Sequence, residues 1–429
     1  MSVKSSSFMF SVFKEQLIGN RSAFQGLVLL FLSVLILFLL VLQFRDPAGG
    51  QIEYGTKGTR DFVQYWSAYT LFSVGENPYD PSLMVEVQKG LGLNEARPVM
   101  MWNPPWLMVM MSPILSLSFP TSVVCWFLLS VCLFFGTALI GRAVSNIEGA
   151  AFAPLLISSL LFFPVWESMV WGQISVFLGF GLALLFWGLK RKNDWLSGFG
   201  LVVLTVKPHL TFLLSVALVF TIIRERRYSL VLVFALGFFA LLTLTHSFNN
   251  HAISDWFASF GEVRRSGAAT SVYDWRVPTL SGWFRALLFD GSSTPASWPM
   301  WLFPLLATIF AVWFLSKIAK EVSDPAARYF IPLLCCSLLF APYGWIYDYS
   351  LLLAPCVFLA CGAYDSPKES SGRILVLILI ILVQLVGILL KMYGPEGHQW
   401  FIWIPAVLLV ISAIAERTLP SLRQGRTAI

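Results

Sequence analysis

The feature that most constrains this chain is a series of long apolar runs separated by short charged segments. The stretches "LVLLFLSVLILFLLVL" (27–42) and "ILVLILIILVQLVGILL" (374–390) contain no charged residue. Lipid cannot hydrogen-bond the backbone, so such runs cross a membrane as helices, which satisfy their own polar groups. Only 12% of all residues are charged, against about 25% in soluble proteins. The sequence therefore predicts an all-α polytopic membrane protein.

Twelve segments are apolar enough to be membrane spans, for which roughly 20 residues are needed. The N-terminal one is long for a signal peptide and lacks a clear cleavage site, so it is interpreted as a retained span. Several are short, which implies a locally thinned membrane or a cavity that reaches into it. The twelve segments are 27–44, 120–141, 151–165, 173–189, 196–206, 208–222, 229–246, 298–316, 330–342, 347–363, 374–392 and 401–415.

Positive charge predicts how these spans are oriented. Cytoplasmic segments of membrane proteins are rich in Lys and Arg. When the tails 1–26 and 416–429 are placed inside, the short cytoplasmic segments hold 18 of the 29 Lys and Arg residues. Both termini are therefore expected in the cytoplasm of a multi-pass protein of the inner (plasma) membrane. The net charge of +6 is weak evidence for a nucleic-acid partner, and none is expected.

This orientation leaves two large outer loops, 45–119 and 247–297, both with amphipathic helices. The apolar run 103–120 lies in the first loop and is interpreted as a re-entrant or interface helix, because a further span would invert every later loop. We expect Pro104, Pro105, Pro113 and Pro120 to break it. The whole chain, residues 1–429, is predicted to be one integral-membrane domain.

Asp61 is the first candidate for chemistry. It follows Arg60 and opens a predicted amphipathic helix over 62–74, which Gly75 would end. Asp61 could be a helix cap that accepts backbone N–H bonds. It could also be a general base, within hydrogen-bond reach of a hydroxyl that loses its proton. The two roles are compatible, because a capping carboxylate can also face a cavity.

Lys207, in "TVKPHLTF", lies between two apolar runs. A charge at bilayer depth costs roughly 2.5–3.5 kcal/mol on insertion scales, so it usually faces a cavity or a partner. The alternative is a lysine that snorkels to the interface from the end of a span. Pro208 interrupts the helix and frees backbone groups at this point, which favours the polar cavity.

Further candidates lie in the same outer segments. Gln173, after Gly172, could bind a polar ligand or pair across helices. Asp348 could cap the helix that it opens or join the site. Arginines of the second outer loop could bind a phosphate bidentately or lie solvated in the loop; they are Arg264, Arg265 and Arg276.

No cofactor or metal is expected. The predicted outer loops contain no Asp-x-Asp motif, and the chain has no Walker loop or dinucleotide fingerprint. His209 and His251 lack partners at metal-ligand spacing. The six cysteines all lie in apolar runs and are interpreted as buried small hydrophobic residues.

Five of these segments, taken in order, resemble glycosyltransferase family 87 of the GT-C superfamily, integral-membrane enzymes that include polyprenol-phosphate mannosyltransferases. The segment "APYGWIYDYSLLL" (341–353) stands where those enzymes carry a His pair, and has Tyr347 and Asp348 instead. His209 stands where some relatives have Gln. The other four are "DFVQYWSAYTLFSVGENPYDP" (61–81), "WNPPWLMVMMSPILSL" (102–117), "GQISVFL" (172–178) and "VKPHLTFLL" (206–214).

The resemblance implies a GT-C-like fold with its active site on the outer face. The donor would be a polyprenyl-phosphate-linked sugar, and the acceptor a lipid or a glycan. Asp61 would be the base of an inverting transfer, and cations would hold the departing phosphate without a metal. The donor-phosphate candidates are Lys207, His209, Arg265 and Arg276, and the substrate-binding candidates are Arg60, Trp102, Gln173, Tyr347 and Asp348.

Two alternatives remain open at the level of sequence. Twelve spans also suit a transporter or flippase of lipid-linked sugars, although few polar residues lie in mid-span away from Lys207. A polymerase or ligase of surface polysaccharide is the other alternative. For it we would expect a dominant outer loop between late spans, whereas here the first outer loop is the prominent one.

Overall fold

The computed structural model describes residues 61–92, 97–145, 158–262, 276–289, 296–318, 321–367, 372–395 and 397–419. Within these ranges the chain consists of α-helices with short 3-10 segments, and it contains no β-strand. The expected first span at 27–44, the start of the expected span 151–165 and the tail 1–26 lie outside the described residues. The helices are α3 (Phe62–Ser73), α4 (Pro81–Gly90), α5 (Trp106–Leu115), α6 (Phe119–Val144), α8 (Phe163–Trp171), α9 (Ser175–Lys190), α10 (Asp194–Leu204), η1 (Pro208–Leu210), α11 (Phe212–Glu225), α12 (Tyr228–Phe248), α13 (Ala252–Glu262), α14 (Leu280–Leu287), α15 (Pro299–Ile318), α16 (Pro325–Arg328), α17 (Phe330–Phe340), η2 (Ile346–Leu352), α18 (Leu353–Tyr364), α19 (Gly372–Tyr393), η3 (Gln399–Phe401) and α20 (Trp403–Thr418).

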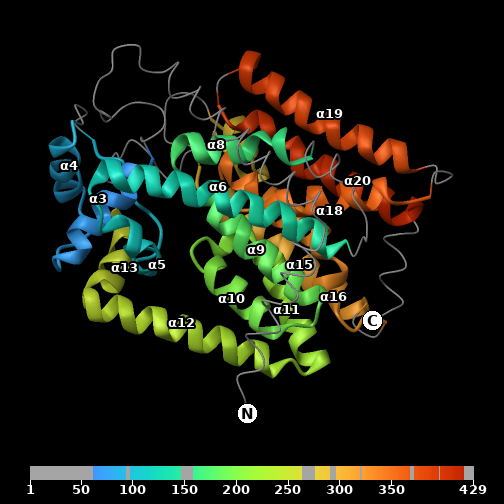
Figure 1. Ribbon diagram of the computed structural model, residues 1–429, viewed down its shortest axis with the longest axis horizontal. Helices are drawn as coiled ribbons and strands as arrows, with labels where there is room; N and C mark the ends of the chain where they lie inside the picture. The colour runs from blue at the N-terminus through green and yellow to red at the C-terminus, as the bar shows by residue number, and fades with distance from the viewer. Residues whose placement is uncertain are drawn as a thin grey trace, which may run out of the picture.

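The expectation of an all-α membrane protein is confirmed. Six helical segments of the described ranges are long and apolar enough to cross a membrane: α6, α12, α15, α19, and the combined segments Ile346–Tyr364 and Gln399–Thr418. Four shorter apolar helices accompany them, namely α5, α9, α10 and α17. The chain is thus a multi-pass membrane protein, and the number of twelve spans stays a prediction. Helices α3, α4, α5 and α13 gather at one side of the molecule, away from α19 and α20 (Figure 1).

Helix α5 forms within the run 103–120. The prolines of this run were expected to break the helix. Pro105 occupies the N-cap and Pro120 lies in the first turn of α6, where a missing N–H costs little. Pro113, however, lies inside α5, so the expectation of a break there is wrong. The hydroxyl of Ser112 donates to the carbonyl of Val109 over 2.9 Å, at the position that Pro113 leaves without a backbone donor. With 10 residues the helix is about 15 Å long, roughly half the hydrocarbon thickness.

Helix α3 forms almost where it was expected, from Phe62 to Ser73. It ends before Gly75, which adopts a left-handed φ of 81°, as a residue just past a helix end often does. The expected amphipathic character is not observed. Eight of its 12 residues are buried, and they include Gln64 and Ser67. The helix is therefore packed into the protein on most of its sides.

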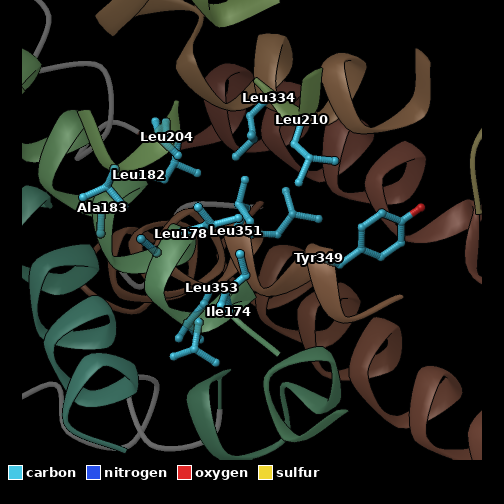
Figure 2. Close-up of a cluster of buried hydrophobic side chains, with 14 of the residues drawn as sticks. Ile174, Leu178, Leu182, Ala183, Leu204, Leu210, Leu334, Tyr349, Leu351 and Leu353 are labelled. Atoms are coloured by element: carbon cyan, nitrogen blue, oxygen red, sulfur yellow. The ribbon is translucent and has the colours of Figure 1, made fainter. Parts of the chain in front are cut away.

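A buried apolar core joins α9 to η2. Leu178 lies close to Leu351 of η2, and Ile174 lies close to Leu353 at the start of α18 (Figure 2). All four are nearly inaccessible to solvent. Helix α9 also packs tightly on α10, because a Cβ on Gly200 would lie 2.5 Å from the carbonyl oxygen of Gly181. Small residues let membrane helices approach in this way. This core supports the start of α9 and the start of η2, from which the candidate site is built.

The segments expected on the cytoplasmic side contact one another at the far end of α9. Arg227, at the start of α12, binds Asp194 of α10 through its Nε over 2.7 Å. Its Nη1 lies 3.8 Å from Asp324 before α16. Helix α9 has 16 residues and is about 24 Å long. It therefore separates this cluster of charges from the polar side chains around Ser175.

Candidate active site

The turn between α8 and α9 lies directly on the start of α3. Gly172 has a φ of 69°, and a Cβ there would lie 2.7 Å from the Cβ of Phe62. Both observations require a residue without a side chain. The backbone N–H of Asp61 donates to the carbonyl of Trp171 over 3.2 Å. The glycine of the Gly-Gln motif therefore brings Gln173 against Asp61.

Asp61 takes the N-cap position of α3, but its side chain makes no capping bond. Its Oδ2 instead accepts a hydrogen bond from the Nε2 of Gln173 over 2.7 Å. The Oε1 of Gln173 accepts one from the hydroxyl of Tyr65 over 2.8 Å. The interpretation of Asp61 as a helix cap is thus wrong for its carboxylate. Gln173 pairs across helices, as one of its two alternative interpretations stated.

Lys207 forms an ion pair with Asp348, with 2.7 Å between Nζ and Oδ1. The lysine side chain is 6% exposed and the aspartate 1%, so the alternative of a snorkelling lysine is wrong. Ser175 Oγ donates to the same Oδ1 over 2.6 Å. The backbone N–H of Trp345 donates to Oδ2 over 2.9 Å. Asp348 therefore caps η2, which is one of the two roles considered for it, and its part in a site stays a prediction.

The two carboxylates belong to one cluster. Gln173 binds Asp61, and Ser175, two residues further along, binds Asp348. Tyr65 lies between them. Burial raises the pKa of the Tyr65 hydroxyl well above its ordinary value, and the charges of Asp61 and Asp348 add to the rise. The hydroxyl therefore stays protonated and acts as a hydrogen-bond donor at any working pH.

Aromatic rings surround Lys207. Its Nζ lies 5.3 Å from the centroid of the Tyr347 ring, within the range of a cation–π contact. His209 stacks on Tyr343 with 4.3 Å between ring centroids. The buried Nε2 of His209 has no hydrogen-bond partner in the part of the chain that the structure describes.

His398 and Tyr65 complete the cluster, and sequence reasoning missed both. The Nδ1 of His398 accepts a hydrogen bond from the backbone N–H of Ile346 over 3.2 Å. Its ring packs edge-on against Trp345 at 5.2 Å. No local motif marks His398. Its place in a predicted outer segment is the only signal in the sequence by which it could have been found. Tyr65 could have been found, because residues four apart lie on the same face of a helix and it follows Asp61 by four.

The other predicted residues lie elsewhere or outside the description. Arg276 is exposed, and its backbone carbonyl accepts a bond from the N–H of His398 over 3.1 Å. Trp102 offers its carbonyl to the indole N–H of Trp256 on α13 over 3.2 Å, which links it to that helix. Arg60 and Arg265 lie outside the described residues. Among the described residues no three His, Cys, Asp or Glu side chains are grouped as metal ligands would be.

The comparisons with known proteins agree with the motifs. The model of glycosyltransferase family 87 matches residues 102–342, which is more than half of the chain and confirms the resemblance. The matched region contains Gln173 and Lys207, and it excludes Asp61 and Asp348. The comparison with curated proteins found no matching sequence.

Proposed function

Because the chain belongs to glycosyltransferase family 87 and is a multi-pass membrane protein, we propose that it transfers a sugar from a polyprenyl-phosphate donor to an acceptor hydroxyl on the outer face of the membrane. The sugar is a hexose or a pentose, with mannose the first to test. The observation that carries this proposal is that one short segment binds both carboxylates. Gln173 binds the partly exposed Asp61, and Ser175 binds Asp348, which pairs with the buried Lys207.

Asp61 is proposed as the general base. The acceptor oxygen attacks the anomeric carbon on the face opposite the phosphate, and its proton passes to the carboxylate of Asp61. The bond between the anomeric carbon and the phosphate oxygen breaks, and the electron pair leaves with the polyprenyl phosphate. The configuration of the anomeric carbon is therefore inverted.

Lys207 is proposed to stabilise the charge that develops on the departing phosphate. An ammonium has three N–H donors, and the ion pair with Asp348 uses one of them. His209 can donate a further hydrogen bond through Nε2, which has no partner among the described residues, and the exposed Arg276 can add positive charge. Fixed donors of this kind lower the barrier because they need no reorganisation as charge develops.

A lipid-linked donor is supported by an apolar groove of about 380 Å³ between α11, α15 and α17. Its lining includes Leu213 and Phe340, which lie in sequence close to His209 and Tyr343. It continues along α17 to Tyr329, about 16 Å away by helix rise. A polyprenyl tail in this groove would bring its phosphate to the level of Lys207.

We propose the predicted topology together with this function. It has twelve spans in one domain, both termini in the cytoplasm of the inner membrane, and residues 45–119 and 247–297 outside. The site draws on Asp61, Gln173, Lys207, Asp348 and His398. This topology places each of them in an outer segment or within two residues of one. The cluster around Arg227 belongs to its cytoplasmic turns. The site and the Arg227 cluster thus lie at opposite ends of α9. Their separation supports the topology independently, because the topology was predicted from charge asymmetry alone.

The test is to incubate the purified protein with radiolabelled polyprenyl-phosphate mannose, glucose and arabinose and with a panel of membrane lipid and glycan acceptors. The proposal expects label in a product that is stable to the mild acid that cleaves the donor. If the labelled donor crosses the bilayer of proteoliposomes and no sugar is transferred to any acceptor, the proposal is contradicted and the transporter alternative is favoured.

A further inference from the structure

We propose that Tyr65 and Gln173 are positioning residues, which together hold the carboxylate of Asp61 in the orientation that accepts the proton. The inference rests on the proposed function, in which Asp61 is the base. It adds a relay of two hydrogen bonds, from the Tyr65 hydroxyl to Gln173 Oε1 over 2.8 Å and from Gln173 Nε2 to Asp61 Oδ2 over 2.7 Å.

The chemistry of the groups determines the direction of the relay. An ionised carboxylate can only accept hydrogen bonds, so the Gln173 amide has to present Nε2 to Asp61. Its Oε1 then points away and needs a donor. Tyr65 is that donor, and burial together with the nearby carboxylates keeps its hydroxyl protonated. Tyr65 thus satisfies the buried acceptor that this orientation of the amide leaves, and reinforces the orientation.

The relay is rigid because the backbone of Gln173, its middle residue, is also held by hydrogen bonds. The backbone N–H of Gln173 donates to the carbonyl of Ser168 over 2.8 Å. The hydroxyl of Ser168 donates to the carbonyl of Gln173 over 3.2 Å. Tyr65 is 1% and Gln173 4% exposed, so water does not compete for their polar atoms. These polar atoms are already engaged with each other and with Asp61, which favours a positioning role over direct binding.

The loss of the Tyr65 hydroxyl has a specific consequence. Without it, the buried Oε1 of Gln173 loses its donor, and the amide is held to Asp61 through Nε2 alone. The carboxylate is then less firmly oriented toward the acceptor hydroxyl, and proton transfer slows. A small misplacement of a catalytic group can cost up to about 100-fold in rate.

The test compares Tyr65→Phe with Tyr79→Phe, in initial rates with polyprenyl-phosphate mannose or whichever labelled donor is active. Tyr79 is a matched control, because it is also buried and its hydroxyl donates to a backbone carbonyl, that of Asn103, over 2.8 Å. We expect kcat to fall about tenfold or more in Tyr65→Phe, with an unchanged KM for the donor. Tyr79→Phe should keep wild-type kcat and KM.

A second variant, Gln173→Glu, tests the relay through pH. A second carboxylate beside Asp61 would make the pair share a proton and raise the apparent pKa of the base. The acid limb of the rate profile should move up by at least about one pH unit, whereas a purely structural defect would lower the rate at every pH. The other titratable groups around Asp61 are Tyr65 and Tyr347, together with Asp348, which is paired with Lys207.

The outcomes distinguish the positioning role of Tyr65 and Gln173 from the proposal that Asp61 is the general base. Asp61→Asn is measured first, and full activity of this variant would refute the role of Asp61 as the base. If Asp61→Asn is inactive but Tyr65→Phe matches Tyr79→Phe in kcat, the base stands and the relay is refuted. Should Gln173→Glu fail to fold, the two tyrosine variants decide the question alone.

Discussion

At the scale of the residue, two of the aspartates that stand at helix starts, Asp61 and Asp80, have different partners. Asp80 caps α4 and accepts backbone bonds from Ser82 over 2.8 Å and Leu83 over 3.3 Å. The carboxylate of Asp61 makes no such bond and binds Gln173. A capping aspartate contributes about 1 kcal/mol of helix stability and needs no catalytic role.

Asp61→Asn keeps the size of the side chain and its acceptor oxygen but removes its basicity. Loss of general-base assistance lowers a rate by roughly 10²–10⁴-fold, so we expect transfer to fall by about that factor while the protein still folds. Asp80→Asn should retain wild-type turnover. Initial rates and size-exclusion profiles of both detergent-purified variants check this, and near-normal transfer by Asp61→Asn would reduce Asp61 to a structural residue.

The buried ion pair predicts that Lys207 and Asp348 depend on each other. Lys207→Ala leaves the carboxylate of Asp348 buried without its cation, which costs about 3–5 kcal/mol, so the melting temperature should drop. The double variant Lys207→Met with Asp348→Asn removes both charges and should regain most of the stability. Transfer should stay low in both, because the donor phosphate lacks its cation. If the double variant regains turnover as well as stability, Lys207 has only a structural role.

At the scale of the element, the α8–α9 turn determines where α3 begins. Gly172→Ala places a methyl group 2.7 Å from the Cβ of Phe62 at a left-handed φ. Gly75→Ala meets no atom within 4 Å at a similar φ, so it carries only the backbone cost of about 1–2 kcal/mol. We expect Gly172→Ala to cost about 1–3 kcal/mol more through overpacking and to reduce transfer strongly. Thermal melts and rates of the two variants check this, and equal behaviour would mean that the close contact is not needed.

At the scale of the whole molecule, the proposed topology makes opposite predictions for its two ends. Arg191, in the turn between α9 and α10, and Asn250, after α12, are both exposed. On a cysteine-free background, Asn250→Cys should react with a membrane-impermeant maleimide added to intact cells. Arg191→Cys should react only after the membrane is opened. Labelling of position 191 from outside would invert the topology and place the candidate site on the wrong face.

Much of the architecture could be predicted from the sequence, since apolar runs and charge asymmetry are local signals. They specify helices, their approximate bounds and a multi-pass membrane protein, because lipid cannot satisfy exposed backbone groups. The motifs also marked Asp61, Gln173, Lys207 and Asp348 as unusual. Because Lys207 lies between short apolar helices, its charge was expected to face a partner or a cavity.

Only the tertiary structure decided which side chains meet. Asp348 is 141 residues from Lys207, and Gln173 is 108 residues from Tyr65. The packing of α9 against η2 and of Gly172 against α3 brings them together, and periodicity along the chain carries no information about such pairs. For the same reason the stacking of His209 on Tyr343 and the contribution of His398 could not be foreseen. The charge and the partners of a buried group depend on neighbours supplied by distant segments.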